Sequence, residues 1–120
     1  MMSQIRILIV EDDPFIAMDI EYAVMDKLGE DAELIIVGSV EEARRAIGSP
    51  VSCALLDIDV VGGKTFDVAR SLLSRGTPIA FVSGATPGDV PDALRQVRFL
   101  RKPFSTREIA SFVSRALKAH

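Results

Sequence analysis

The stretch VSCALLDID, residues 51–59, indicates both the fold class and the location of the candidate functional site. Residues 51–56 are apolar at most positions, which is typical of a parallel strand covered on both of its faces. The run then ends at two carboxylates, Asp57 and Asp59. Four other short runs rich in apolar and β-branched residues are also predicted to be strands, at residues 5–10, 34–37, 78–82 and 97–100.

The segments between these strands have helical patterns with well-marked ends. Asp13 followed by Pro14 is predicted to cap a helix, and Gly29 is a suitable end for it. A serine three residues before a glutamate, the spacing of a capping box, occurs at Ser39 with Glu42 and at Ser105 with Glu108. A third helix is expected at about residues 65–75. The last helix has an apolar stripe made of Ile109, Phe112, Val113, Ala116 and Leu117.

Two features of the first helix need an interpretation. Asp13 completes a run of three acids, but its capping role accounts for it, so it is not counted among the metal ligands. The large side chains of Met18, Tyr22 and Met25 are predicted to pack against the rest of the protein.

Five strands alternating with five helices predict a doubly wound α/β fold, a three-layer sandwich with a five-stranded parallel sheet. The fourth helix is the weak element. Residues 86–96 contain two prolines and a glycine, so a short or irregular helix is expected from Val90 or Pro91 to Arg95. The length of 120 residues predicts a single domain over residues 1–120.

The composition narrows the classes of function. Hydrophobic residues make up 48% of the chain and charged residues 26%, as in globular proteins. The net charge of −3 and the lack of a basic stripe argue against nucleic-acid binding. No apolar stretch approaches the roughly 18 residues of a membrane span, and no signal peptide is recognised, so a cytoplasmic protein without membrane contact is expected. The single cysteine, Cys53, lies in an apolar run and is expected to be buried.

Polar residues follow four of the predicted strands directly. Glu11 and Asp12 follow the first, Asp57 the third, Ser83 the fourth and Lys102 the fifth. In open α/β sheets, ligands bind outside the carboxyl ends of the strands, so we expect these side chains to meet there. Carboxylates that converge require a divalent cation or protonation, and oxygen ligands favour Mg²⁺.

The same edge could also hold a tetrahedral anion. The hydroxyl of Ser83 and the ammonium group of Lys102 could bind its oxygens. Positioning and charge neutralisation supply most of what phosphoryl transfer needs, and Asp57 would then be the nucleophile.

At this point the chain resembles a known family, the CheY-like receiver domains of bacterial two-component response regulators, which have a flavodoxin-like fold. Four motifs carry the resemblance in the family's order: ILIVED at 7–12, CALLDID at 53–59, PIAFVSG at 78–84 and FLRKPF at 99–104. Together they span nearly the whole chain.

The resemblance implies a role for each matching residue. Asp57 would be the phosphoacceptor, assisted by Lys102 and Ser83. Mg²⁺ would be bound by Asp12, Asp57 and the backbone carbonyl of Asp59, and by Glu11 through water. Ser83 and Phe99 would form the conformational switch, and the peptide bond before Pro103 would be cis.

The resemblance further implies a stand-alone signalling switch rather than an enzyme with a separate substrate. A histidine kinase or a histidine phosphotransfer protein would supply the phosphoryl group. The output would be contact with an unknown downstream protein, or the domain would serve as a phosphate sink. Ala85 and the acidic Asp59 depart from the usual pattern and are expected to change the lifetime of the phosphoryl group.

Other hypotheses stay open. The chain could be a docking module without a phosphorylation cycle, the receiver portion of a hybrid kinase, or a small Mg²⁺-dependent phosphatase. The stretch DIDVV at 57–61 resembles the opening of haloacid-dehalogenase-type phosphatases, but 56 residues precede it and too few follow for that fold. The stretch GGKT at 62–65 lacks the first glycine of a phosphate-binding loop, because position 58 is Ile58. Its glycines are interpreted as the turn into the third helix.

Overall fold

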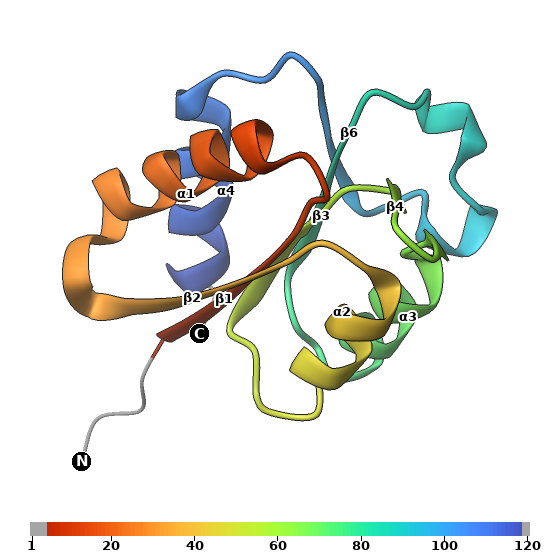
Figure 1. Ribbon diagram of the computed structural model, residues 1–120, viewed down its shortest axis with the longest axis horizontal. Helices are drawn as coiled ribbons and strands as arrows, with labels where there is room; N and C mark the ends of the chain where they lie inside the picture. The colour runs from red at the N-terminus through yellow and green to blue at the C-terminus, as the bar shows by residue number, and fades with distance from the viewer. Residues whose placement is uncertain (1–4, 119–120) are drawn as a thin grey trace.

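The apolar runs form the sheet at the centre of the computed structural model, which describes residues 5–118 (Figure 1). Its five strands are all parallel and lie in the order β2-β1-β3-β6-β7. They are β1 (Ile5–Val10), β2 (Ala32–Val37), β3 (Cys53–Leu56), β6 (Ile79–Ser83) and β7 (Arg98–Arg101). The predicted parallel sheet is therefore confirmed. Several strands begin or end one or two residues away from the predicted bounds.

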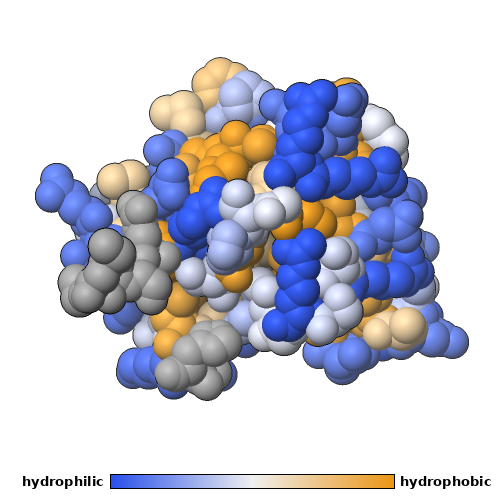
Figure 2. Space-filling model, turned by 90° about the horizontal axis from the view of Figure 1, so that it is seen from below, coloured by the Kyte–Doolittle hydropathy of each residue, from blue (hydrophilic) through white to orange (hydrophobic). Residues whose placement is uncertain are grey.

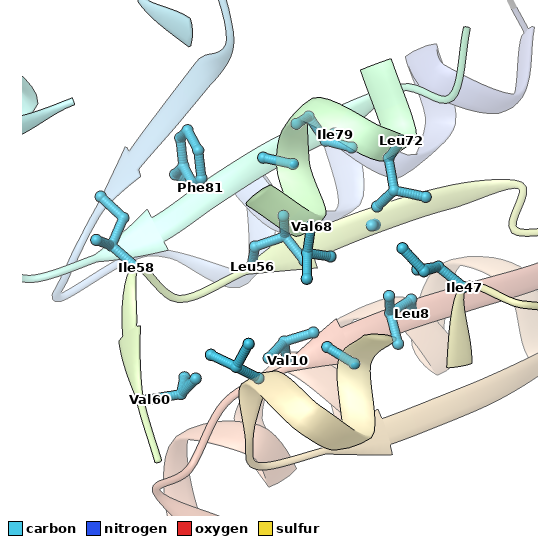
Figure 3. Packing of buried hydrophobic residues seen from close by; sticks show 14 of the residues in the cluster. Leu8, Val10, Ile47, Leu56, Ile58, Val60, Val68, Leu72, Ile79 and Phe81 are labelled. Carbon is cyan, nitrogen blue, oxygen red and sulfur yellow. The ribbon is translucent and has the colours of Figure 1, made fainter. Parts of the chain in front are cut away.

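Helices cover both faces of this sheet. In Figure 1, α1 (Pro14–Leu28) and α4 (Thr106–Lys118) lie on one side, and α2 (Val40–Ala46) and α3 (Phe66–Ser74) on the other. Alternate residues of each strand supply the two cores, as β1 illustrates: Ile7 packs toward α1 and α4, whereas Leu8 packs toward α2 and α3 (Figure 3). The three-layer, doubly wound α/β fold is confirmed.

The predicted helix caps are present. The Asp13 carboxylate accepts hydrogen bonds from the backbone N–H groups of Phe15 (2.9 Å) and Ile16 (3.4 Å). Gly29 ends α1 with a φ of 61°, and its N–H donates to a carbonyl of the last turn. At the start of α4, Ser105 and Glu108 exchange both bonds of a capping box.

The fourth helix is short and irregular, as expected. No α-helix lies between β6 and β7; two short 3₁₀ turns, η2 (Pro87–Asp89) and η3 (Asp92–Leu94), take its place. The proline at position 91 cannot donate a helical hydrogen bond and disfavours helical geometry in the residue before it, so the two turns cannot join. The expected irregular segment therefore corresponds to η3, whose Leu94 is buried over the sheet.

A small hairpin between β3 and α3 was not predicted. Its strands are β4 (Asp59–Val60) and β5 (Gly63–Lys64), which pair in antiparallel fashion. Gly62 and Gly63 have φ values of 94° and 126°, a region that favours glycine. Gly62 thus lies in the turn of a hairpin and Gly63 begins its second strand, rather than both forming a simple entry into α3.

The predicted packing role of Met18, Tyr22 and Met25 is wrong. These side chains are exposed, as is Phe15, and together the four form a stripe along the outer face of α1 that we call the α1 stripe. The core face of α1 is made instead of smaller residues, namely Ala17, Ile20, Ala23 and Val24. Because this helix is apolar on two faces, its composition could not show which face the sheet covers.

Figure 2 shows one face of the molecule, seen from below, where hydrophobic side chains are interspersed with hydrophilic ones. Cys53 is buried, as expected, and burial raises the pKa of its thiol to about 12.

Within residues 5–118, no helix is long and apolar enough to cross a membrane.

Candidate functional site

Three acids meet at the carboxyl ends of β1 and β3. Glu11, Asp12 and Asp57 can each offer a carboxylate oxygen such that these atoms lie within 4.8 Å of one another. The sheet register explains this arrangement, because Val10 pairs with Leu56 and the residues that follow are then neighbours. The Asp57 N–H also donates to the Val10 carbonyl at 2.8 Å, which extends the pairing one residue beyond the strands.

Glu11 is the most buried of these acids, with 4% of its surface exposed. Its Oε1 accepts a hydrogen bond from Lys102 Nζ at 2.7 Å, and its Oε2 accepts one from the Asp13 N–H at 3.0 Å. Burial nevertheless raises the pKa of Glu11, because the loss of hydration outweighs these two bonds. The side chain therefore lies in a site where added positive charge would be favourable.

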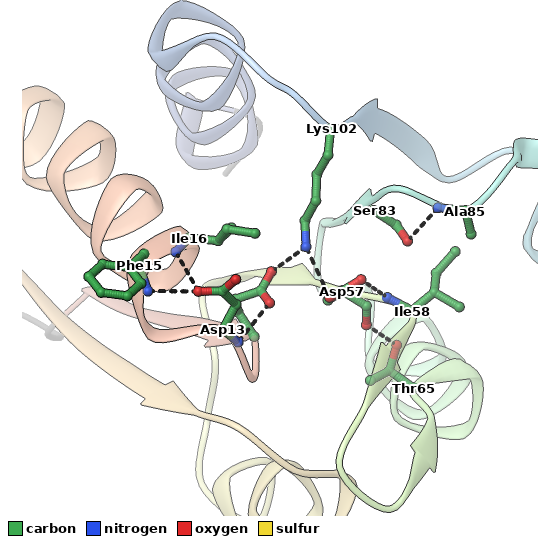
Figure 4. A network of polar contacts seen from close by, with 10 residues as sticks. Asp13, Phe15, Ile16, Asp57, Ile58, Thr65, Ser83, Ala85 and Lys102 are labelled. Carbon is green, nitrogen blue, oxygen red and sulfur yellow. Dashed lines mark hydrogen bonds and ion pairs between the residues drawn. The ribbon is translucent and has the colours of Figure 1, made fainter.

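Asp57 lies beside Glu11 and contacts the same ammonium group, that of Lys102. Asp57 Oδ2 accepts a hydrogen bond from Lys102 Nζ at 3.1 Å, and Oδ1 accepts one from the Ile58 N–H at 2.8 Å (Figure 4). Burial by itself would lower the pKa of Lys102, but the two carboxylates outweigh it and raise this pKa. Lys102 is thus a charged group held between two buried acids.

The backbone places Lys102 in this position. Its N–H donates to the Ser83 carbonyl at 3.0 Å, so the end of β7 follows the end of β6. The peptide bond between Lys102 and Pro103 is cis, as the resemblance implied.

Ser83 ends β6, and Phe99 lies on the neighbouring strand β7. Ser83 is buried, and its hydroxyl accepts a hydrogen bond from the Ala85 N–H at 3.2 Å rather than bonding to Asp57 (Figure 4). Phe99 is half-buried on β7 and lines a cavity of about 50 Å³ together with Phe81 and Leu94. The switch role of Ser83 and Phe99 remains a prediction.

The side chain of Asp59 forms an exposed ion pair with Lys64 and is not part of the acid cluster. The role of its backbone carbonyl as a Mg²⁺ ligand remains a prediction. Asp13 caps α1 and does not belong to the cluster.

The donor set suits a hard divalent cation. Carboxylate oxygens are the ligands that Mg²⁺ prefers, and Asp12 is exposed, so a cation could enter from that side. Among residues 5–118, this is the one group of three acidic, histidine or cysteine side chains that could bind a metal ion. The side chains therefore fit the predicted Mg²⁺ site.

One residue at the site was missed. Thr65 was predicted only as the start of the third helix, yet its hydroxyl donates to the Asp57 backbone carbonyl at 2.6 Å. The sequence offers no signal for this bond, because a threonine before a helix normally caps it.

Comparisons with known proteins find similarity at the level of the whole fold. No family model matches the chain, and no curated protein matches it by sequence. Solved structures do match. SdrG from Sphingomonas melonis Fr1 is 32% identical with a TM-score of 0.75, and the alignment covers 98% of this chain and 99% of that one.

Two further solved structures are similar over nearly their whole length. The receiver domain of the response regulator PhyR from Erythrobacter litoralis is 26% identical with a TM-score of 0.78, covering 97% of this chain and 92% of that one. A CheY-like response regulator receiver domain protein from Methanospirillum hungatei JF-1 is 22% identical with a TM-score of 0.81, covering 98% and 96%. At that lower identity, the second match shows a shared fold.

Proposed function

Because the chain belongs to the family of response-regulator receiver domains, we propose that it is a signalling switch controlled by phosphorylation of Asp57. The phosphoryl group comes from a histidine kinase or a histidine phosphotransfer protein, and the reaction requires Mg²⁺. The observation that carries this proposal is the buried contact of Lys102 with both Glu11 and Asp57, next to the open carboxylate of Asp12.

Each residue of the site has its own role in phosphoryl transfer. A carboxylate oxygen of Asp57 forms the new O–P bond while the P–N bond of the donor phosphohistidine breaks, and the electron pair returns to the imidazole nitrogen. Lys102 neutralises charge on the incoming phosphoryl oxygens from the position that it already occupies between the acids. Glu11, Asp12, Asp57 and the Asp59 carbonyl would hold Mg²⁺, which would supply further charge neutralisation.

The output of this switch is a change of surface. The Ser83 hydroxyl leaves the Ala85 N–H and bonds to the phosphoryl group, and Phe99 moves with it toward the core. Phosphorylation acts through its differential stabilisation of one of two states. The segment with η2 and η3 replaces a regular helix beside this site, so we place the contact with a downstream protein there. The alternative output is that the domain drains phosphate from its partners. We propose that these events take place in the cytoplasm.

The direct test is phosphorylation by a small donor. Incubation with acetyl phosphate and Mg²⁺ is expected to add one phosphoryl group, detected by intact-mass spectrometry, and omission of Mg²⁺ should prevent the addition. Absence of an adduct with acetyl phosphate and with every histidine kinase of the source organism would contradict the proposal.

Mg²⁺ binding separates this proposal from a docking module without a phosphorylation cycle. Mg²⁺ that binds the folded protein and not the unfolded chain should raise the free energy of unfolding by about 2.7 kcal/mol at a Mg²⁺ concentration of about 100 times Kd. Urea unfolding with and without Mg²⁺ measures this shift, with Na⁺ at equal ionic strength as the control. A docking module has no need of the ion, so an unchanged stability would favour that alternative.

The α1 stripe is the surface that we assign to the phosphodonor. The stripe begins at Phe15, directly after the cap of α1 beside the acids, and continues through Met18, Tyr22 and Met25. A shallow hollow of about 420 Å³ lies along it, and a second of about 350 Å³ joins α1 to Lys102. Residues of α1 therefore line both hollows, one along the stripe and one at Lys102.

The charges around the stripe indicate the chemistry of the partner. Three acids, Asp19, Glu21 and Asp26, line these hollows. A second copy of the chain would bring like charges together, whereas a donor with an apolar surface rimmed by basic side chains would be complementary. We therefore expect the donor to have that chemistry.

Replacing Tyr22 with Ala is expected to weaken transfer from a protein donor by about tenfold or more, because large aromatic side chains dominate such interfaces. Transfer from acetyl phosphate should not change, since this donor does not need the stripe. The rates of phosphorylation by the two donors measure the difference, and Arg44→Ala on α2, across the sheet, serves as a surface control. Equal losses with both donors would argue against the docking role.

A further inference from the structure

Thr65 precedes α3 at the N-cap position, but its hydroxyl does not cap that helix. Threonine at this position usually accepts a hydrogen bond from a backbone N–H two or three residues later. Here the hydroxyl instead donates to the backbone carbonyl of Asp57, at 2.6 Å (Figure 4). The side chain thus contributes to the backbone of the phosphoacceptor rather than to its own helix.

The same residue closes the segment between β3 and α3. The Thr65 N–H donates to the Ile58 carbonyl at 3.0 Å, and the β4–β5 hairpin lies between these two residues. Thr65 is fully buried, so water does not compete for its hydroxyl. Two consecutive carbonyls, those of Asp57 and Ile58, are therefore held by this one residue.

This arrangement reaches the reactive carboxylate through a single rigid unit. The Asp57 carbonyl and the Ile58 N–H belong to the same planar peptide group. That N–H donates to Asp57 Oδ1 at 2.8 Å. A bond that fixes the carbonyl end of the plane also fixes its N–H end, and with it the orientation of the carboxylate.

We propose that Thr65 is a positioning residue, which holds the Asp57–Ile58 peptide plane and so orients the Asp57 carboxylate for Mg²⁺ binding and phosphoryl transfer. The inference rests on the proposed function of the site. It adds a requirement that the acid cluster, the hydroxyl of Ser83 and Lys102 do not supply, because none of them is hydrogen-bonded to the Asp57 carbonyl among the described residues.

The test compares variants that differ by one hydroxyl. Thr65→Val keeps the shape of the side chain without the donor and is expected to weaken Mg²⁺ binding by about tenfold, as for other groups that orient metal ligands. The maximal rate of phosphorylation at saturating acetyl phosphate should fall as well. In the metal-free protein, amide hydrogen exchange at Ile58 should accelerate. Thr65→Ser keeps the hydroxyl and should restore all three properties.

Thr77→Val is the matched control, since Thr77 is also a buried threonine but precedes β6, at the end of the sheet away from the acids. It should leave Mg²⁺ affinity and Ile58 exchange unchanged. If Thr65→Val does not fold, Thr65→Ala against Thr65→Ser provides the same comparison of one hydroxyl.

The outcomes separate this inference from the function on which it rests. Wild-type protein that binds no Mg²⁺ and accepts no phosphoryl group would overturn both. Wild-type protein that does both, together with Thr65→Val of equal affinity, rate and exchange, would overturn the positioning role alone. A lower unfolding stability in Thr65→Val without these changes would also overturn it, because the hydroxyl would then be merely structural.

Discussion

Replacing Asp57 with Asn will abolish the incorporation of the phosphoryl group while leaving the fold intact. The amide cannot act as the nucleophile that the carboxylate provides. It retains an oxygen that can accept the hydrogen bond from the Ile58 N–H, so the local structure should persist. Intact-mass spectrometry after incubation with acetyl phosphate and Mg²⁺ should show only unmodified protein.

The same substitution should also weaken Mg²⁺ binding. Asp57 contributes one of the three clustered carboxylates, and even groups that merely orient metal ligands are worth about tenfold in affinity. We expect a loss of at least about tenfold. A titration of the metal-free protein measures it without any phosphodonor.

Asp59→Asn is the matched control for this experiment. It is the same chemical change two residues away, on an exposed side chain that pairs with Lys64. This variant should still accept one phosphoryl group, although the lifetime of that group is expected to differ. An adduct of normal yield on Asp57→Asn, or its loss in Asp59→Asn, would mean that the phosphoacceptor is another residue.

Replacing Lys102 with Met should lower the free energy of unfolding by about 3 kcal/mol at neutral pH in the absence of Mg²⁺, because it leaves a buried acid without its partner. The side chains of Glu11 and Asp57 are 1% and 9% exposed, so water can replace the ammonium group only in part. Phosphoryl transfer should also fall, since the variant lacks the cation that faces the incoming group.

The pH dependence of this loss follows from the two shifted pKa values. The pKa of Lys102 is raised, so its contribution is complete below the ordinary value of 10.5 and disappears only as pH rises through the folded-state pKa. The pKa of Glu11 is raised above 4.5, so ionised Glu11 destabilises the folded state increasingly as pH rises from 4.5 through its folded-state pKa. The deficit of Lys102→Met should therefore be large at neutral pH and shrink as Glu11 becomes protonated.

Urea unfolding at about pH 7.5 and about pH 5 measures this difference. Lys64→Met is the control, because it breaks an exposed ion pair with Asp59, which is worth roughly 0–1 kcal/mol. Equal effects of the two substitutions at both pH values would contradict the central role of Lys102.

Several elements could be predicted from local patterns. The five strands and the caps at Asp13, Gly29 and Ser105 follow from short-range chemistry, and the structure contains them all. The candidate site could be predicted because each of its residues lies at or just after the carboxyl end of a strand. Parallel strands bring such positions to one edge, whatever their distance along the chain.

Other features depended on competition between local preferences and packing. A short or irregular helix was expected within residues 86–96, but the sequence did not show that this segment would form two 3₁₀ turns that bury Val90 and Leu94. The hairpin at residues 59–64 was read as a simple turn, because its strands have two residues each and no hydrophobic alternation.

The sequence by itself determined the order of the sheet-forming runs, the polar residues at their ends and the family resemblance, because all of these depend on residue type and short spacing. Only the tertiary structure decided which face of α1 is covered, that Lys102 contacts Glu11 and Asp57 together, and that the Thr65 hydroxyl bonds to Asp57. These outcomes depend on which partner lies nearest in space. That distance is set by the packing of segments far apart along the chain, and no local pattern contains it.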